Sequence, residues 1–171
     1  MADGKHYEIE KKYLIRYPDA ALLAAQPGAV KWEITQLYLT SAPGETRRIR
    51  QVGVDGLMKY YKTFKRRVSG MTAEEDEGEI SQFDYIKLSR EGAPGARPVV
   101  KMRYRVPWAG HLLEFDLYPF WQDRAILEVE LEAEDEPHAI PEWVQIIRDV
   151  SDDLAYKNSS LAREIPHEDI D

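Results

Sequence analysis

The sequence predicts an α+β fold, in which about eight strands form a closed antiparallel β-barrel with a few short flanking helices. Two observations support this. Segments that alternate between apolar and polar residues recur along the chain, as expected for strands with one buried face. Most of these segments are joined by short turns such as Ala42–Glu45 and Asp55-Gly56, and hairpin connections make neighbouring strands antiparallel. A sheet with that many hairpin-connected strands can close into a barrel.

The alternation also gives approximate element bounds. We expect strands over residues 8–15, 31–40, 46–52, 57–67, 77–80, 99–106, 111–118 and 126–133. Turn and loop residues separate them, including a polar loop over 68–76 and a turn over 107–110. Short helices are predicted over 20–26, over 81–90 with a capping-box spacing of Ser81 and Asp84, from Pro141 onward, and over 151–162.

Length and composition limit the possible functions. The 171 residues fit a single domain, 1–171, with a core over about 5–162 and an exposed tail over 163–171. A net charge of −8 argues against nucleic acid as a partner. The absence of cysteine excludes disulfides and thiolate metal sites, and the four histidines lack metal-ligand spacing. No signal region or membrane-spanning run is present, so we expect a cytoplasmic protein that does not bind membranes; its oligomeric state stays open.

Charged residues occupy one face of nearly every predicted strand. In the first strand, Glu8, Glu10 and Lys12 alternate with Ile9 and Lys11. The same arrangement recurs in pairs or triplets that are sorted by sign: Arg48 and Arg50, Glu77 and Glu79, Lys101 with Arg103 and Arg105, Glu114 and Asp116, and Glu128 with Glu130 and Glu132. Solvated outer faces would give a similar pattern. Sorted charges inside a barrel would instead let carboxylates hold hard divalent cations while guanidinium groups hold a polyanion beside them.

The order of these residues resembles the CYTH superfamily, also called triphosphate tunnel metalloenzymes. The family's Glu-x-Glu-x-Lys hallmark corresponds to Glu8, Glu10 and Lys12. Further similar segments follow in order: Gln36-Leu37-Tyr38-Leu39, Arg48-Ile49-Arg50, Thr63-Phe64-Lys65, Glu77-Gly78-Glu79-Ile80, Lys101-Met102-Arg103-Tyr104, Asp116, Leu127-Glu128-Val129-Glu130-Leu131, and the bacterial-type ending over 149–162. The chain departs from that ending at Ala155, where many bacterial relatives have Arg; our hypothesis is that Lys157 supplies the missing charge.

The resemblance implies a triphosphate bound along the barrel interior, together with Mg²⁺ or Mn²⁺. Phosphate contacts are then expected from seven basic residues: Lys12, Arg48, Arg50, Lys65, Lys101, Arg103 and Lys157. The metal ligands implied are Glu8, Glu10, Asp116, Glu128 and Glu130, with Glu77 and Glu79 as supporting acids. The catalytic set implied is Glu8, Glu10, Lys12 and Glu130. Whether a second metal or a carboxylate such as Glu130 or Glu79 activates the water stays open.

The function that this resemblance implies is metal-dependent hydrolysis of a small triphosphate. Inorganic tripolyphosphate, cleaved to pyrophosphate and phosphate, is the substrate favoured by the bacterial-type ending and the absence of an extra domain. The alternatives are a nucleoside or thiamine triphosphatase, an adenylyl cyclase, and a non-catalytic module that binds polyphosphate or nucleotides.

Overall fold

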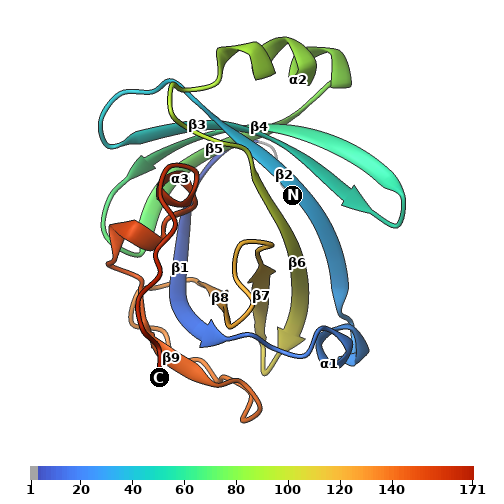
Figure 1. The fold of residues 1–171 in the computed structure, drawn as a ribbon, viewed down its shortest axis with the longest axis vertical. Coiled ribbons are helices and arrows are strands. Elements are labelled where there is room, and N and C mark those ends of the chain that lie inside the picture. The colour runs from blue at the N-terminus through green and yellow to red at the C-terminus, as the bar shows by residue number, and fades with distance from the viewer. Residues whose placement is uncertain (1–3) are drawn as a thin grey trace.

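The strands form one continuous sheet that closes on itself. The computed structural model describes residues 4–171, with the backbone alone for Gly4 and Lys5. The strand order is β5-β4-β3-β2-β6-β7-β8-β1-β9, every neighbouring pair is antiparallel, and an additional pairing of β5 with β1 closes the first eight strands into a barrel (Figure 1). The predicted fold class is therefore confirmed, with β9 as one extra strand on the edge of β1.

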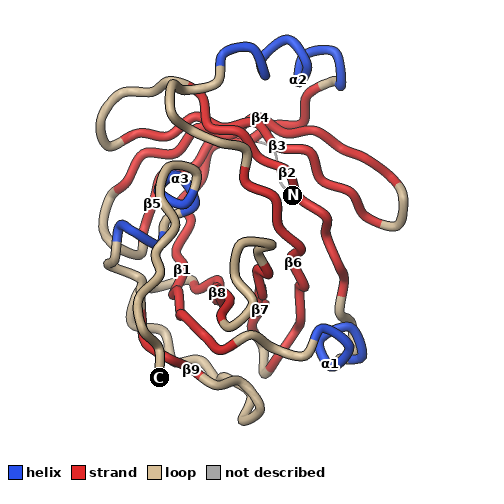
Figure 2. The backbone as a smooth tube through the Cα atoms, viewed as in Figure 1, coloured by secondary structure: helices blue, strands red, loops and turns tan. Residues whose placement is uncertain are grey.

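The secondary structure is mainly β (Figure 2). The strands are β1 Gly4–Arg16, β2 Val30–Leu39, β3 Glu45–Val54, β4 Leu57–Arg67, β5 Thr72–Ile80, β6 Val99–Trp108, β7 His111–Leu117, β8 Arg124–Leu131 and β9 Ile146–Asp149. The helices are α1 Ala20–Ala25, α2 Gln82–Leu88 and α3 Asn158–Leu161, with 3-10 turns η1 Ser89–Glu91 and η2 Leu154–Tyr156. No helix in residues 4–171 is long and apolar enough to cross a membrane.

Local chemistry explains the turns and the starts of two helices. Asp55 and Gly56 both have positive φ, 50° and 79°, which matches the type I′ turn of a tight hairpin. Ala109 and Gly110 form the same kind of turn between β6 and β7, so β6 extends through Pro107 and Trp108, which the sequence placed in the turn. Ser81 caps α2 as predicted, because its hydroxyl accepts a hydrogen bond from the amide of Asp84 at 3.0 Å.

Three predicted segments differ in the structure. Strand β5 begins at Thr72, because the acidic stretch predicted as a loop pairs with β4 on one side and β1 on the other. No helix begins at Pro141; a turn leads into β9, which covers the edge of β1 that extends beyond β5. The helix predicted over 151–162 is reduced to the short elements η2 and α3.

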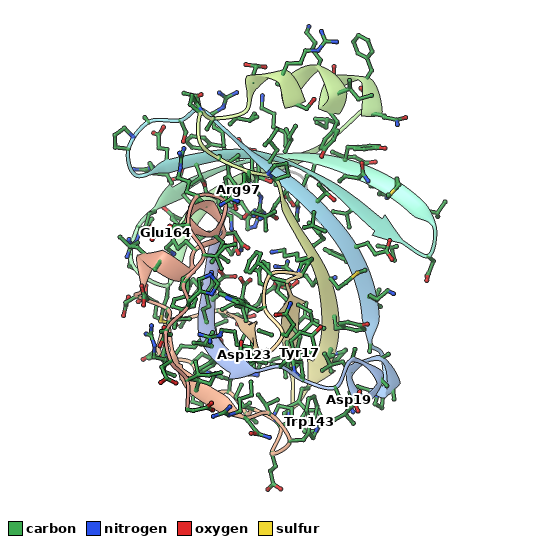
Figure 3. The ribbon with its side chains drawn as sticks, in the orientation of Figure 1. Tyr17, Asp19, Arg97, Asp123, Trp143 and Glu164 are labelled. Atoms are coloured by element: carbon green, nitrogen blue, oxygen red, sulfur yellow. The ribbon has the colours of Figure 1, made fainter. Side chains whose placement is uncertain are left out.

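Apolar residues cover the outside of one half of the barrel. The outward faces of β1, β6, β7 and β8 form a buried cluster that includes Ile15, Val106, Phe115 and Leu127. Trp143, labelled in Figure 3, covers this cluster from the loop before β9, with its ring stacked on Phe115 at 5.8 Å between centroids. This layer holds the wall rigid from outside, so the opposite face of the same strands is free to be polar.

A second apolar cluster plugs one end of the barrel interior. The inward-facing series of β1 and β8 continue past Lys12 and Glu128 to Leu14 and Ile126, and both are fully buried. Residues after β9 pack onto these side chains. The cluster consists of Leu14, Tyr38, Val99, Tyr118, Trp121, Ile126, Val150, Tyr156, Leu161 and Ala162. The C-terminal segment therefore closes this end of the barrel, beside β1 in Figure 1.

The last residues are docked on the barrel through specific contacts, although several side chains of the predicted tail, such as Glu164 and His167, are exposed. Trp121 donates from its indole nitrogen to the carbonyl of Pro166 at 3.1 Å, and Arg124 donates to the carbonyl of Glu168 at 2.7 Å. The Glu168 carboxylate lies 2.7 Å from the guanidinium of Arg148 and accepts a hydrogen bond from the Tyr156 hydroxyl. These contacts join distant parts of the sequence, which the local pattern of 165–171 does not show.

The docked tail predicts a pH-dependent contribution to stability. Hydrogen bonds from Arg148 and Tyr156 lower the pKa of Glu168 to about 2, so the ionised carboxylate favours the folded state. That contribution is complete above the unfolded pKa, near 4.5, and is lost as the pH falls toward 2. We expect Glu168→Gln to lower Tm at pH 7 by roughly 2–4 °C, corresponding to about 1 kcal/mol for a partly exposed pair.

Thermal melts from pH 7 to pH 2.5 test this. The gap between Glu168→Gln and wild type should narrow as the pH falls, since protonation removes the same interaction. Glu164→Gln, which removes an equal charge from an exposed position of the same segment (Figure 3), is the control. A gap that stays constant with pH would contradict the ion-pair origin.

Candidate functional site

The predicted charged faces point into the barrel, except near strand ends, where Glu79 and Glu132 are exposed. The pairing register places opposite charges next to each other across strands: Lys12 lies opposite Glu128, and Arg103 opposite Asp116. Since side chains alternate along a strand and pair across neighbours on the same face, one inward residue fixes the orientation of the whole ring. The interpretation of these charges as solvated outer faces is therefore wrong.

The interior holds a polar cavity with two adjoining lobes. The barrel lobe, about 310 Å³, lies among the strands and is lined by Glu8, Glu10, Trp32, Arg48, Arg50, Lys65, Glu75, Glu77, Arg103, Arg105, Glu114, Glu128, Glu130 and Asn158, with His6, Tyr7, Ile9 and Leu131 beside them. The seam lobe, about 390 Å³, lies between the middle of β1, the turns around Gly44 and Gly70, and the segment around α3, and it includes Lys12, Tyr38, Arg67, Ser69, Lys157, Ser159 and Ser160. Both lobes share Glu8, Glu10, Arg48, Lys65 and Asn158.

The seam lobe exists because the edge of β1 changes partner at Glu10. The Glu10 amide donates to the carbonyl of Met71 at 3.1 Å, and the Lys12 amide donates to the Ser151 hydroxyl at 2.9 Å. The Val150 amide returns a bond to the Lys12 carbonyl at 2.9 Å. Residues of the neighbouring loops thus form hydrogen bonds with the part of β1 that pairs with neither β5 nor β9. The backbone groups of Glu10 and Lys12 are therefore paired, although β1 has no neighbouring strand on that side there.

A buried ion-pair cluster forms the floor of the barrel lobe. Arg103 binds Asp116 with two bonds, from Nε to Oδ1 at 2.8 Å and from Nη2 to Oδ2 at 2.9 Å. The ammonium of Lys101 adds a third at 2.8 Å, and Asp116 is fully buried. Burial would raise the pKa of Asp116, but Arg103 and Lys101 hold it below its usual value. Asp116 therefore orients both cations; its assignment as a metal ligand stays a prediction.

Glu10 and Glu128 form the acidic centre of the cavity. Burial, together with the charges of Glu128 and Glu8, raises the pKa of Glu10 well above its usual value. Burial alone would do the same to Glu128, but Lys12, at 3.5 Å, and Arg103, also at 3.5 Å, hold its pKa far below normal. Burial therefore favours the protonated form of Glu10, while the neighbouring cations favour the ionised form of Glu128.

Lys65 lies between two acids at the junction of the lobes. Its ammonium is 2.9 Å from Glu8 and 3.3 Å from Glu75. Burial followed by hydrogen bonding to Glu8 raises the pKa of Glu75 to about 7, while the charge of Lys65 keeps the pKa of Glu8 low against its burial. The single positive charge of Lys65 therefore stabilises the ionised form of Glu8, whereas the pKa of Glu75 is raised.

Arg48 and Arg50 form the wall opposite these acids. Both guanidinium groups approach Glu77, Arg50 at 3.4 Å and Arg48 at 3.9 Å, and Thr63 donates a hydrogen bond of 2.6 Å to the same carboxylate. Glu77 thus contacts both guanidinium groups. Two guanidinium groups on one wall of a cavity are suited to binding a polyanion.

The barrel lobe has an acidic rim at β7 and β8. Glu130 is exposed at the mouth of the lobe; partial desolvation there and the nearby Glu114 raise its pKa to about 7. Glu114 itself accepts hydrogen bonds of 3.2 Å from both Arg103 and Arg105. A carboxylate with a pKa near neutrality can exchange a proton with water in this lobe.

Most of the predicted site residues lie together. The predicted residues that line the cavity are Glu8, Glu10, Lys12, Arg48, Arg50, Lys65, Glu77, Arg103, Glu128, Glu130 and Lys157. Lys101 and Asp116 lie behind the lining, and the exposed Glu79 lies farther along β5, opposite Tyr61. Sequence reasoning missed Glu75 and Asn158, and left Arg105 and Glu114 out of the site although it placed them on charged strand faces. Extending the Glu77–Glu79 alternation back by one step would have found Glu75; the signal for Asn158 is its place in the bacterial-type ending over 149–162.

Comparison with known proteins identifies the family. Residues 6–165 match the CYTH domain. The chain belongs to the CYTH family. A curated relative, the inorganic triphosphatase of Nitrosomonas europaea, is 33% identical over 168 residues, which cover 93% of this chain and 99% of that protein.

Solved CYTH-like structures show the same fold. A crystal structure of an inorganic triphosphatase aligns with a TM-score of 0.57 and 29% identity, and the alignment covers 94% of this chain and 97% of that one. A protein from Pyrococcus horikoshii OT3 aligns with a TM-score of 0.58 and 22% identity over 75% of this chain and 80% of that one. A putative adenylate cyclase from Bacillus halodurans, at 16% identity and a TM-score of 0.55 over 77% of this chain and 84% of that one, shares the fold alone.

The acids of this CYTH protein fit a divalent cation that is completed by substrate. Within residues 4–171, no three acidic or imidazole groups converge into a ready-made metal site. Mg²⁺ does not require one, because it is commonly held by one or two carboxylates together with substrate phosphates and water. Glu10 and Glu128 both line the cavity, with Glu8 on the same strand and Glu130 opposite Glu10 in the strand pairing, so these carboxylates could hold a cation.

The floor of the CYTH cavity makes a prediction about stability. Asp116→Asn removes the charge that neutralises Arg103 and Lys101, so we expect the free energy of unfolding to fall by about 3–5 kcal/mol, the usual cost of breaking a buried ion pair. Urea denaturation at pH 7 measures this. Asp76→Asn, at an exposed position of β5, is the matched control and should change stability by less than about 0.5 kcal/mol. Equal stability of the two variants would contradict the anchoring role of Asp116.

Proposed function

We propose that this CYTH protein is a divalent-metal-dependent triphosphatase that hydrolyses inorganic tripolyphosphate to pyrophosphate and phosphate. The observation that carries the proposal is the cavity inside the barrel, which is lined both by the cations of Arg48, Arg50 and Lys65 and by the acids Glu10 and Glu128. The 33% identity with the Nitrosomonas europaea inorganic triphosphatase supports the substrate assignment, since it extends over nearly the whole of both chains.

In this proposal, the basic wall binds the phosphate oxygens. Arg48, Arg50 and Arg103 present forked donors that match phosphate geometry, and the ammonium groups of Lys12 and Lys65 act as point charges beside them. Lys157 lines the seam lobe, where burial and the nearby Lys12 lower its pKa. An anion bound in that lobe could therefore contact two ammonium groups, those of Lys12 and Lys157. This placement supports the hypothesis that Lys157 replaces the Arg that is absent at Ala155.

The reaction then requires water to attack a terminal phosphorus in line with the leaving oxygen. The bond from water oxygen to phosphorus forms, the phosphoanhydride bond breaks, and pyrophosphate leaves with the electron pair. Glu130, whose pKa partial desolvation and Glu114 raise to about 7, is placed in the barrel lobe to accept the proton of the water. Mg²⁺ or Mn²⁺, held by Glu8, Glu10 and Glu128, would neutralise charge on the phosphate oxygens.

A second candidate substrate is an organic triphosphate. Trp32 lines the barrel lobe, and the guanidinium carbon of Arg105 lies 4.2 Å from the centre of its ring. Such an aromatic and cationic pair could bind a nucleobase or a thiazolium ring at the end of a triphosphate. Inorganic tripolyphosphate uses neither group, so Trp32 separates the two candidates.

A phosphate-release assay tests the proposal. Purified protein is given tripolyphosphate, ATP, thiamine triphosphate or pyrophosphate, each with Mg²⁺, with Mn²⁺ or with EDTA. We expect metal-dependent release from tripolyphosphate, inhibition by EDTA, and no cleavage of pyrophosphate. Preference for an organic triphosphate that is lost in Trp32→Ala would favour the second candidate. Binding without turnover of any triphosphate would show a non-catalytic module and overturn the proposal.

A variant of Glu10 tests the acidic centre. Glu10→Gln removes a proposed metal ligand, so we expect metal-dependent turnover to fall by at least about 100-fold. Folding should be unaffected, because burial and Glu128 already disfavour the charged form of Glu10. The measurement is turnover against metal concentration, with Tm as the folding check. The control is Glu33→Gln on the exposed outer face of β2. Turnover near the wild-type rate would exclude Glu10 as a ligand.

A further inference from the structure

Asn158 occupies the point where the two lobes of the cavity meet. It is the first residue of α3 and lines both the barrel lobe and the seam lobe. The other residues shared by the lobes are Glu8, Glu10, Arg48 and Lys65, all of them charged. A ligand that extends from one lobe into the other must therefore pass the neutral carboxamide of Asn158.

Two donors fix the orientation of this carboxamide. The Tyr118 hydroxyl donates to Oδ1 of Asn158 at 2.6 Å, and the ammonium of Lys101 donates to the same oxygen at 3.4 Å. Because an ammonium group has no acceptor, the oxygen and not the nitrogen of the amide must face Lys101. The amide nitrogen then faces away from both donors, and it forms no hydrogen bond with any residue that the structure describes.

Lys101 gains access to the cavity only through this amide. Its ammonium is 1% exposed and does not line either lobe, because Asp116 and Asn158 lie around it. A cation bound to the amide oxygen withdraws electron density from the amide and makes its N–H groups stronger donors, as in any polarised hydrogen-bond chain. The positive charge of Lys101 is thus presented to the cavity as a neutral, forked pair of N–H groups.

We propose that Asn158 binds the polyphosphate chain directly through its amide N–H groups at the junction of the lobes, and that Lys101 and Tyr118 are positioning residues for that contact. The inference rests on the proposed function and adds to it a substrate-binding residue that carries no charge. Arg48 and Lys65 reach the same junction from β3 and β4, so the amide adds a third donor side to a phosphate held between them.

Asn158→Asp separates a substrate contact from a structural role. The carboxylate keeps an oxygen for Tyr118 and Lys101, and it pairs with Lys101 more strongly, but it has no N–H to offer. If Asn158 only held these two residues, Asp would be neutral or stabilising. If the amide binds phosphate, we expect affinity for tripolyphosphate to fall by roughly 10- to 100-fold, the usual loss for a hydrogen bond to a charged group. Asn158→Ala should lose a comparable amount.

The readout is direct binding of inorganic tripolyphosphate by calorimetry without metal, followed by KM and kcat with Mg²⁺. Thermal melts confirm that each variant is folded, and Gln82→Glu on the exposed face of α2 adds an equal charge outside the barrel. A wild-type protein that binds tripolyphosphate while Asn158→Asp binds it equally well overturns this inference alone. A wild-type protein that neither binds nor hydrolyses tripolyphosphate overturns the proposed function and this inference with it. Weakened binding and raised KM in both Asn158→Asp and the uncharged Asn158→Ala, with Gln82→Glu unchanged, support it, because repulsion by a new carboxylate would weaken Asn158→Asp alone.

Discussion

The paired charges inside the barrel are the constraint on which the rest of the structure depends. Arg103 and Asp116 show why: each is almost completely buried, and either one alone would carry a large desolvation penalty. The same balance recurs around Lys65 and around Glu77. A polar interior of this kind is tolerated because the hydrophobic stabilisation is placed elsewhere, in the outer layer under Trp143 and in the plug around Leu14 and Tyr156. The apolar packing that stabilises the barrel therefore lies mainly on its outer surface and at its closed end.

This self-neutralised interior also determines how a ligand can enter. Every carboxylate that now faces a lysine or arginine must change partner when phosphate takes that cation. Under the proposed function, a divalent cation compensates the acids while phosphate compensates the bases, so the two bind best together. The raised pKa of Glu10 has the same origin, since burial and Glu128 leave one carboxyl group without a counter-charge. The position with the least compensated acid is where an added cation relieves the most repulsion.

The sequence predicts the barrel well because the governing signal is local. Alternation of two residues decides which face is charged, and closure then forces all those faces inward, as for Glu8, Glu10 and Lys12. Prediction from the sequence fails where pairing with a distant strand, and not the local pattern, determines the structure. Residues 72–76 are rich in Glu and Asp, which disfavour strands, yet they lie between β4 and β1 and form one. Strand β9 and the tail are set by contacts with β1 and with Arg148, which lie far away in the sequence.

The C-terminal segment both closes one end of the barrel and adds residues to the lining of the cavity. Val150 and Ser151 bond to the backbone of Lys12, Tyr156 enters the apolar plug, and Asn158 and Lys157 follow directly into the cavity. The alternating pattern of the strands cannot predict Lys157 and Asn158 as lining residues, because neither belongs to a strand of the barrel wall. A segment that crosses the seam can add donors on the open side of β1. For that reason, the polar residues after β9 belong to the site as much as those of the wall, although no strand pattern marks them.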